Sequence, residues 1–312
     1  MTVPAPLLAD PGEPPDVLVA VVTYNSAATI DRFLRALPPA LHGAGTARVV
    51  VVDNDSHDGT VERVTALAPW AVVLPAGANL GYGAGVNLAL RAARPRRGAY
   101  VLNPDAVPSP GSVAPLAHAV EEHPGTGIAV PRVLDDEGRL KFSLRREPTI
   151  TRAVGEALLG GHRAARFARW GDMIRDATYY VDGATADWAT GAAMFLSPRT
   201  LEEVGLWPED YFLYSEETEY ALRARDAGLR LRLVTAATVV HPGGDMEVSP
   251  WLWSLVAVNR TRLYRKRHGP LLGAAYWAVV VANEASRAML GRRTHRAALR
   301  ALLTGGRIPA PR

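Results

Sequence analysis

Asp105 lies where a buried strand is expected to end. The apolar run Tyr100–Leu102 comes before it, and Asn103 and Pro104 separate the two. A short apolar run between turn-forming residues predicts a strand, and a proline cannot continue a central strand, so the chain must leave the sheet here. In open α/β sheets the crevice beyond the strand ends binds ligands, and a carboxylate there suits Mg²⁺ or Mn²⁺ held mainly by a diphosphate. An Asx-type turn explains the same residues without any site.

Two further groups of polar or glycine residues follow expected strands. Asp53-Asn54-Asp55 follows the aliphatic run 48–52, and the glycine-rich loop Gly81–Gly85 follows the run 72–74. The loop lacks the full dinucleotide-binding fingerprint, comes after the third strand rather than the first, and has no P-loop lysine. A dinucleotide-dependent oxidoreductase and a P-loop NTPase are therefore disfavoured. Taken singly, each group is equally well explained as a turn.

Three acidic residues open a helix that is expected from residue 216 onward. They are Glu216, Glu217 and Glu219. Carboxylates stabilise a helix N-terminus, and Glu219 can pair with Arg223 one turn away. This structural explanation accounts well for Glu219 and less well for the two adjacent acids.

The elements that would position these residues alternate between strands and helices. Aliphatic runs at 17–23, 48–52, 72–74 and 99–102 are typical of strands buried on both faces. Four β-then-α units in succession predict a three-layer α/β fold with a mainly parallel central sheet and right-handed crossovers. The proline pair at 38–39 is expected to end the first helix.

The pattern changes in the second half of the chain. One hairpin arm is expected at 140–146, and an Ala/Arg-rich helical region is expected at 151–175. A helix at 216–226 is followed by Gly228, which suits a helix end. Further strands are expected at 127–131, 192–196, 230–234 and 238–241.

The composition is that of a folded protein of ordinary polarity. The chain has 312 residues, 48% hydrophobic and 21% charged, with a formal net charge of +4. It has no cysteine, which excludes disulfides, thiolate metal sites and cysteine nucleophiles, and which is compatible with a reducing cytoplasm. Lys141 and Lys266 are the only lysines, so contacts with phosphate would fall mainly to arginine. The N-terminal segment does not have the pattern of a signal peptide.

The C-terminal region is expected to be helical, with basic and apolar residues interleaved. The apolar run 271–282 is too short for a membrane-spanning helix, and polar residues interrupt its continuation. A helix packed within the protein explains this run. A helix that lies on a membrane surface, beside the basic residues at 260–267, explains it equally well.

Five ordered motifs together resemble the inverting, family 2 glycosyltransferases with the nucleotide-diphospho-sugar-binding A fold (GT-A). The resemblance covers roughly residues 17–269, and the late acidic helix followed by His241 is one of the five motifs. The subgroup most similar in its motifs is that of the bacterial rhamnosyltransferases of cell-wall linkage and O-antigen synthesis. The other four motifs are VVTYN at 21–25, VVDNDSHDGT at 51–60, NLGYGAGVN at 79–87 and LNPDA at 102–106.

The resemblance implies a domain organisation and a nucleotide site. It implies a GT-A catalytic domain at 17–245. The many prolines and weak periodicity of residues 1–16 predict a flexible tail before this domain, and the amphipathic pattern predicts a helical region at 246–312 after it. Within the domain, 17–107 would be the nucleotide-binding half and 108–245 the acceptor half. The residues expected at the nucleotide are Thr23, Tyr24, Asn25, Asp53, Asp55, Asn79, Gly81, Gly85 and Asn103.

The resemblance also implies a metal ion and a catalytic base. Asp105 and His241 would be ligands of Mg²⁺ or Mn²⁺, although a lone histidine is usually structural. The family commonly has a second carboxylate where this chain has Asn103, which puts metal dependence in doubt. Glu217 occupies the position of the base, where the family has Asp, and Glu216 is its rival. The reaction implied is a single displacement at the anomeric carbon with inversion.

Donor and acceptor are also expected from the resemblance. The donor would be a nucleotide-diphospho-sugar, with dTDP- or UDP-sugars favoured, and Asp187, Trp188 and Gly191 would form the acceptor side. The acceptor would be a saccharide or a polyprenyl-diphosphate-linked saccharide, reached in the cytoplasm with or without peripheral membrane contact. A soluble small-molecule acceptor and a catalytically idle sugar-nucleotide- or polymer-binding protein are the alternatives. A nucleotidyltransferase is disfavoured, because Tyr24-Asn25-Ser26 stands where its glycine-rich loop is expected. No nucleic-acid partner is expected, and the oligomeric state is left open.

Overall fold

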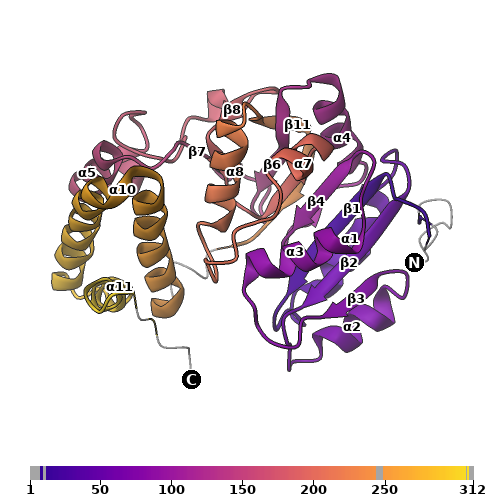
Figure 1. The fold of residues 1–312 in the computed structure, drawn as a ribbon, viewed down its shortest axis with the longest axis horizontal. Coiled ribbons are helices and arrows are strands. Elements are labelled where there is room, and N and C mark those ends of the chain that lie inside the picture. The colour runs from indigo at the N-terminus through magenta and orange to yellow at the C-terminus, as the bar shows by residue number, and fades with distance from the viewer. Residues whose placement is uncertain (1–7, 10–11, 244–248, 307, 309–312) are drawn as a thin grey trace. The chain divides into compact units, whose positions relative to one another are not determined.

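The computed structural model describes residues 8–9, 12–243, 249–306 and 308. These residues form two compact units. The first unit comprises residues 1–143, 177–212 and 216–242, and the second comprises 144–176, 213–215 and 243–312. Each unit is described separately (Figure 1).

A mixed β-sheet forms the centre of the first unit. Its strands are β1 (Val17–Thr23), β2 (Ala47–Asp53), β3 (Val72–Pro75), β4 (Gly98–Leu102), β5 (Val107–Pro108), β6 (Thr126–Leu134), β8 (Thr185–Ala186), β10 (Ala193–Leu196) and β11 (Arg230–Val240). In the described residues their order is β3-β2-β1-β4-β10-β6-β11-β5, with β8 paired to β11. Strands β1 to β4 are mutually parallel, whereas β10 is antiparallel to both of its neighbours. The parallel half confirms the expected β-then-α units.

Helices cover both faces of this sheet and complete the expected three layers. Val17, Val19 and Val21 of β1 lie in the core under α1, α2 and α4, while Val22 on the other face packs against Gly85 of α3. The first set of helices is α1 (Ile30–Ala40), α2 (Thr60–Leu67) and α4 (Val113–Glu122). The second set is α3 (Tyr82–Ala92), α7 (Pro198–Glu203) and α8 (Glu216–Asp226). Strand β9 (Trp188–Ala189) and a short 3₁₀ turn, η2 (Ala177–Tyr179), also belong to this unit.

Several local expectations differ from the structure. Helix α1 continues through the proline pair to Ala40. The two prolines have no N–H to donate, but the backbone N–H of Leu41 after them donates to the carbonyls of Leu37 and Pro38. The two strands expected at 230–241 form one strand, β11, with an irregularity between Val234 and Thr238. The predicted tail falls largely on residues outside those described. Its described part is tied down, since Ala9 N–H donates to the carbonyl of Ala47.

The second unit is helical around a long bent element, α10 (Pro250–Met289). The bend is at Gly269, whose φ of 81° favours glycine, and Pro270 begins the second half. The two halves pack closely: the rings of Tyr264 and Tyr276 stack with centroids 4.1 Å apart. The other elements of the unit are α5 (Ile150–Leu159), α6 (Gly161–Ala164), α11 (Arg293–Leu303) and the short strand β7 (Leu144–Arg145). No helix in the described part of the chain has the length and apolarity needed to cross a bilayer.

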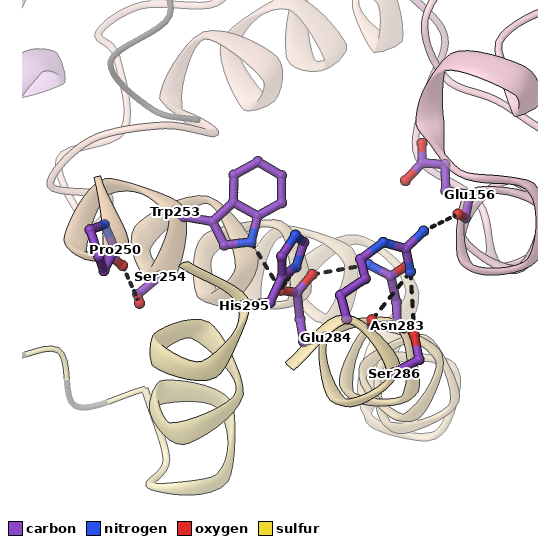
Figure 2. Close-up of polar contacts among 9 residues, drawn as sticks. Glu156, Pro250, Trp253, Ser254, Asn283, Glu284, Ser286 and His295 are labelled. Atoms are coloured by element: carbon purple, nitrogen blue, oxygen red, sulfur yellow. Dashed lines mark hydrogen bonds and ion pairs between the residues drawn. The ribbon is translucent and has the colours of Figure 1, made fainter. Parts of the chain in front are cut away.

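A polar network ties these helices together (Figure 2). The buried carboxylate of Glu284 accepts a hydrogen bond from Trp253 Nε1 at 2.9 Å and lies 2.7 Å from His295 Nδ1. Arg287 Nη2 donates to the carbonyl of Glu156 on α5 at 3.0 Å. Arg260 pairs with the carboxylate of Glu156, also at 3.0 Å. The network therefore joins both halves of α10 to α11 and to α5.

Residues 144–176 pack with the C-terminal helices, whereas the sequence interpretation placed them in the acceptor half of the catalytic domain. The Ala/Arg-rich region at 151–175 is only partly helical, since α5 and α6 end at Leu159 and Ala164. Gly160, whose φ is 78°, separates α5 from α6.

Candidate active site

The ends of β1 and β2 place Thr23 and Asp53 side by side. The two residues are register partners, and Thr23 Oγ1 donates to Asp53 Oδ1 at 2.8 Å. Ser56 donates to both oxygens of the same carboxylate, through Oγ at 2.7 Å and through its backbone N–H at 2.9 Å. Asp53 is thus buried and accepts three hydrogen bonds within the protein, which leaves about one acceptor position for a ligand.

The loops after these strands bind each other. Asn25 has a φ of 49°; its N–H donates to Ser56 Oγ at 2.9 Å, and its Oδ1 accepts the N–H of His57 at 2.9 Å. Tyr24 beside it is half exposed. Asp55 also has a left-handed backbone, with a φ of 66°, and its carboxylate lies 3.5 Å from His57 Nε2. The predicted nucleotide residues from β1 and β2 therefore form one cluster.

The glycine-rich loop is shaped by close contact with the protein's own backbone. A Cβ on Gly81 would lie 2.3 Å from the carbonyl oxygen of Phe212, and one on Gly83 would lie 2.5 Å from that of Pro208. Asn79 Oδ1 accepts the N–H of Gly81 at 3.2 Å. These glycines therefore bring the start of α3 against residues 208–212, just before the acidic helix.

Asp105 and His241 lie together, as the sequence interpretation expected. Asp105 follows β4, His241 follows β11, and His241 Nε2 is 3.3 Å from Asp105 Oδ2. Burial acts to raise the pKa of Asp105, but the hydrogen bond and charge of His241, with the charge of Lys141, hold that pKa below its usual value. Lys141 Nζ donates to the carbonyl of His241 at 3.1 Å and also to that of Pro242. The carboxylate is therefore ionised at neutral pH and next to a fixed cation.

These residues suit a divalent cation only as a partial ligand set. Among the described residues no group of three or more His, Asp or Glu side chains is placed to hold a metal ion. One carboxylate and one imidazole nitrogen are nevertheless appropriate for Mg²⁺ or Mn²⁺ when a diphosphate and water supply the remaining positions. Asn103 is held by its backbone, since its N–H donates to the carbonyl of Ala192 at 2.9 Å.

Glu216 and Glu217 begin α8 in different surroundings. Two consecutive non-glycine residues with left-handed φ, Tyr214 at 68° and Ser215 at 81°, lead into this helix. Such strained backbone is found preferentially at functional sites. Glu216 is buried beneath the glycine-rich loop, whereas Glu217 is only partly buried and lies against Gly191. A Cβ on Gly191 would be 3.3 Å from Glu217 Cβ, so the glycine gives this side chain its space.

Tyr82 lies within range of both the acidic helix and Asp105. Its hydroxyl donates to the carbonyl of Gly191 at 3.5 Å. Burial raises the pKa of Tyr82, and the charges of Glu216, Glu217 and Asp105 raise it further. The three carboxylates therefore lie within electrostatic range of one phenol, which keeps its proton at neutral pH.

The structure also places the residues expected on the acceptor side, and two residues that the sequence did not single out. Asp187 accepts a hydrogen bond from Arg225 of α8 at 3.1 Å, so its carboxylate is engaged within the protein. Trp188 lies beside it in β9 and is partly buried. Tyr82 and Lys141 were not singled out as site residues. The position of Tyr82 between two glycines of the loop could have indicated that it is a site residue. No sequence pattern indicated Lys141, which only the folding of the chain brings to the site.

Comparison with known proteins identifies the family. Residues 18–179 match the family described as Glycosyl transferase family 2. The chain belongs to this family. It is 30% identical, over 72% of its length and 76% of the relative's, to the N-acetylglucosaminyl-diphospho-decaprenol L-rhamnosyltransferase of Mycobacterium tuberculosis. It is 25% identical, over 72% of its length and 67% of the relative's, to the low-salt glycan biosynthesis hexosyltransferase Agl10 of Haloferax volcanii.

A solved structure supports the fold of this family 2 glycosyltransferase. The mannosyltransferase PcManGT from Pyrobaculum calidifontis, in complex with GDP-Man and Mn²⁺, matches with a TM-score of 0.53. The match has 22% sequence identity and covers 96% of this chain and 81% of that chain. This match confirms the expected GT-A fold, and the family match, together with the mycobacterial relative, confirms the expected glycosyltransferase class.

Proposed function

We propose that this glycosyltransferase transfers a sugar, with inversion, from a nucleotide-diphospho-sugar to a hydroxyl of a lipid-diphosphate-linked saccharide. The observation that carries the proposal is the gathering of Glu217, Glu216 and Asp105 around Tyr82, with His241 and Lys141 beside Asp105. An inverting displacement needs one base at the acceptor and positive charge at the leaving diphosphate. The cluster offers both within one site.

Glu217 is the proposed base. As a residue, Glu217 is less buried than Glu216, and its side chain lies beside Gly191, on the proposed acceptor side. Glu216 is buried under the loop that would contact the donor, where an acceptor hydroxyl has less access. Glu217 would take the proton from that hydroxyl as the oxygen attacks the anomeric carbon.

Asp105 and His241 would hold the divalent cation. When bound, Mg²⁺ or Mn²⁺ would offset the charge that grows on the departing nucleoside diphosphate. The ammonium group of Lys141 adds positive charge near the same place, where its Nζ donates to the carbonyls of His241 and Pro242. We propose that this lysine compensates in part for Asn103, which stands where the family commonly has a second carboxylate.

The nucleotide would bind across the ends of β1, β2 and β4. Asp53 retains about one free acceptor position, which suits the N–H of a pyrimidine base, and half-exposed Tyr24 can cover the base. A dTDP- or UDP-sugar is proposed on this basis. Rhamnose as the sugar and a polyprenyl-diphosphate-linked acceptor are proposed from the named activity of the mycobacterial relative. Contact with the inner face of the cytoplasmic membrane is proposed with them, because such an acceptor is carried by a lipid.

The test compares Glu217→Gln with Glu216→Gln. The first change is expected to lower turnover by about 100-fold or more, the usual contribution of a general base, with little change in donor affinity. If Glu217→Gln stays within a few-fold of the unchanged enzyme while Glu216→Gln is inactive, the assignment of the base is wrong. A catalytically idle binding protein would release no nucleoside diphosphate from any donor, with or without acceptor. Activity that survives exhaustive EDTA treatment would argue against the proposed metal ligands.

A further inference from the structure

The second half of α10 has an apolar surface on the side that faces solvent. Seven positions fall on one face of this helix, because each is three or four residues from another of the set, and each carries Leu, Ala or Met. Leu271 is 86% exposed and Met289 is 82% exposed. The five alanines of this face that lie between them are exposed, except for Ala285, which is half-buried. The exposed face consists of Leu271, Ala274, Ala275, Ala278, Ala282, Ala285 and Met289.

The polar residues of the same segment face the interior of the unit. Glu284 is buried against Trp253 and His295, and Arg287 reaches the carbonyl of Glu156. Tyr276 and Val280 lie on this buried side as well. A surface helix ordinarily places its charged side chains towards water, and this one does the reverse. A contiguous apolar face of this kind marks an interaction surface.

The charge around the face identifies the kind of partner. Residues 250–303 contain ten Arg or Lys side chains and a single carboxylate, the buried Glu284. Exposed cations flank the apolar face on both sides along the chain: Arg262, Arg265 and Lys266 precede it, and Arg292, Arg293, Arg296 and Arg300 follow it. Two copies of this chain joined through the face would bring two strongly basic surfaces together. An anionic surface with an apolar interior complements both features.

We propose that the exposed face of residues 271–289 inserts into the headgroup and upper acyl region of an anionic phospholipid bilayer, with the flanking arginines on the lipid phosphates. The membrane surface would serve the proposed function, because a lipid-linked acceptor would be presented there. In that respect this inference rests on the proposed function. The binding itself involves no donor, acceptor or metal ion. It can therefore be measured independently of sugar transfer.

Flotation with lipid vesicles is the test. The full-length protein is expected to float with vesicles of phosphatidylcholine mixed with phosphatidylglycerol, and to remain largely in the dense fraction with pure phosphatidylcholine. Leu271→Gln combined with Met289→Gln should weaken the partition into anionic vesicles by about tenfold or more, because two side chains lose their apolar contact with the lipid. Both residues are exposed, so the core of the unit is unaffected.

The matched control makes the same kind of change elsewhere. Val72→Gln combined with Leu206→Gln alters two apolar side chains that are 42% and 41% exposed in the first unit. This pair should float like the unchanged protein. Arg292→Gln combined with Arg293→Gln should weaken binding to anionic vesicles by about tenfold and reduce its dependence on salt.

Three results would overturn the proposal. The first is a failure of anionic vesicles to retain the unchanged protein at low salt. The second is flotation of the Leu271→Gln, Met289→Gln protein to the same extent as the control. A lipid-free dimer that dissociates on that same double substitution would assign the face to a second copy of the chain. Release of nucleoside diphosphate from the donor is measured on the same samples. If nucleoside diphosphate is released but the protein does not float, only the membrane surface is rejected. If the protein floats but no nucleoside diphosphate is released, only the proposed function is rejected.

Discussion

At the scale of single residues, the site depends on small side chains as much as on charged ones. Gly191 leaves space for Glu217, and Gly81 and Gly83 admit the carbonyls of Phe212 and Pro208. An alanine at Gly81 would have a strained backbone, because the φ there is 86°. It would also displace the backbone at Phe212, because its Cβ would lie 2.3 Å from the carbonyl oxygen of that residue. The glycine-rich loop thus positions the start of the acidic helix, in addition to any contact with a nucleotide.

Lys141 carries a prediction at this scale. Its replacement by Met removes the cation beside Asp105, so the affinity for a nucleoside diphosphate in EDTA should fall by about tenfold, as for the loss of a charge-assisted hydrogen bond. Saturating Mg²⁺ should restore much of the lost affinity. Isothermal titration calorimetry with dTDP and UDP provides the measurement.

Two further variants separate the charge of Lys141 from its structural contacts. Lys141→Arg keeps the charge and should retain most of the affinity, while Lys266→Met, a change of the only other lysine, should have no effect. If Lys141→Met lowers the melting temperature and leaves nucleotide affinity unchanged, the lysine only anchors the turn at His241 and Pro242.

The sequence indicated which charged residues lie at the candidate site, but it did not indicate the residues to which they are hydrogen-bonded. Asp105 and His241 are 136 positions apart, and only their places at the ends of two strands suggested a shared ligand. Lys141 could not be assigned in this way, because it follows an irregular segment rather than a strand end. The same limit applies to Asp53: its position after β2 was predictable, whereas its hydrogen bonds with Thr23 and Ser56 depend on the register of two strands.

At the scale of elements, predictions were best where one pattern dominated. The aliphatic runs fixed β1 to β4, and the acidic residues with Gly228 fixed α8 at Glu216–Asp226. Helix α10 was anticipated as a helical region, but its bend at Gly269 and the packing of α5 against it were not. The packing of α5 depends on contacts between residues more than 100 positions apart, such as Arg260 with Glu156, and no local pattern encodes it. The bend did have a local signal, the pair Gly269-Pro270.

The cluster around Glu156 carries a prediction about pH. Burial, followed by the neighbouring Asp172 carboxylate, raises the pKa of Glu156 from 4.5 to about 7, although Arg260 opposes the shift. The folded protein therefore binds this proton more tightly than the unfolded chain does. Its contribution to stability is full below pH 4.5 and is lost as the pH rises towards 7.

Glu156→Gln should abolish this dependence, because glutamine does not titrate. Between about pH 5 and about pH 8, the free energy of unfolding of the unchanged protein relative to the variant should fall by about 2 to 3 kcal/mol. Urea unfolding at both pH values measures this difference. Glu203→Gln, at an exposed ion pair with Arg199, should show no such change. Parallel pH profiles for the unchanged protein and Glu156→Gln would contradict the raised pKa.

At the scale of the whole molecule, charge is divided unequally between the two units. The first unit contains 24 Asp or Glu and 16 Arg or Lys residues, and the second contains 7 and 19. The acidic unit contains the proposed donor site, whose carboxylates suit a metal ion, and the basic unit contains the proposed lipid surface. A net charge of +4 for the whole chain conceals this division.

The division predicts that two ligands protect separate parts of the chain from hydrogen exchange. UDP or dTDP with Mg²⁺ should slow exchange at the strand ends and loops around 23–25, 53–56, 79–85 and 103–105, because ligands that bind the folded form suppress local opening. The same nucleotide should leave residues 250–303 unchanged. Anionic vesicles should slow exchange in 271–303 and leave the four loops unchanged.

Hydrogen-exchange mass spectrometry on the full chain measures both effects. The uncharged nucleoside at equal concentration serves as the control for the nucleotide, and phosphatidylcholine vesicles serve as the control for the lipid. Nucleotide protection confined to residues 250–303 would contradict the donor site. Vesicle protection at the four loops, without protection of 271–303, would place the lipid surface on the first unit, and the separation of the two functions would then be wrong.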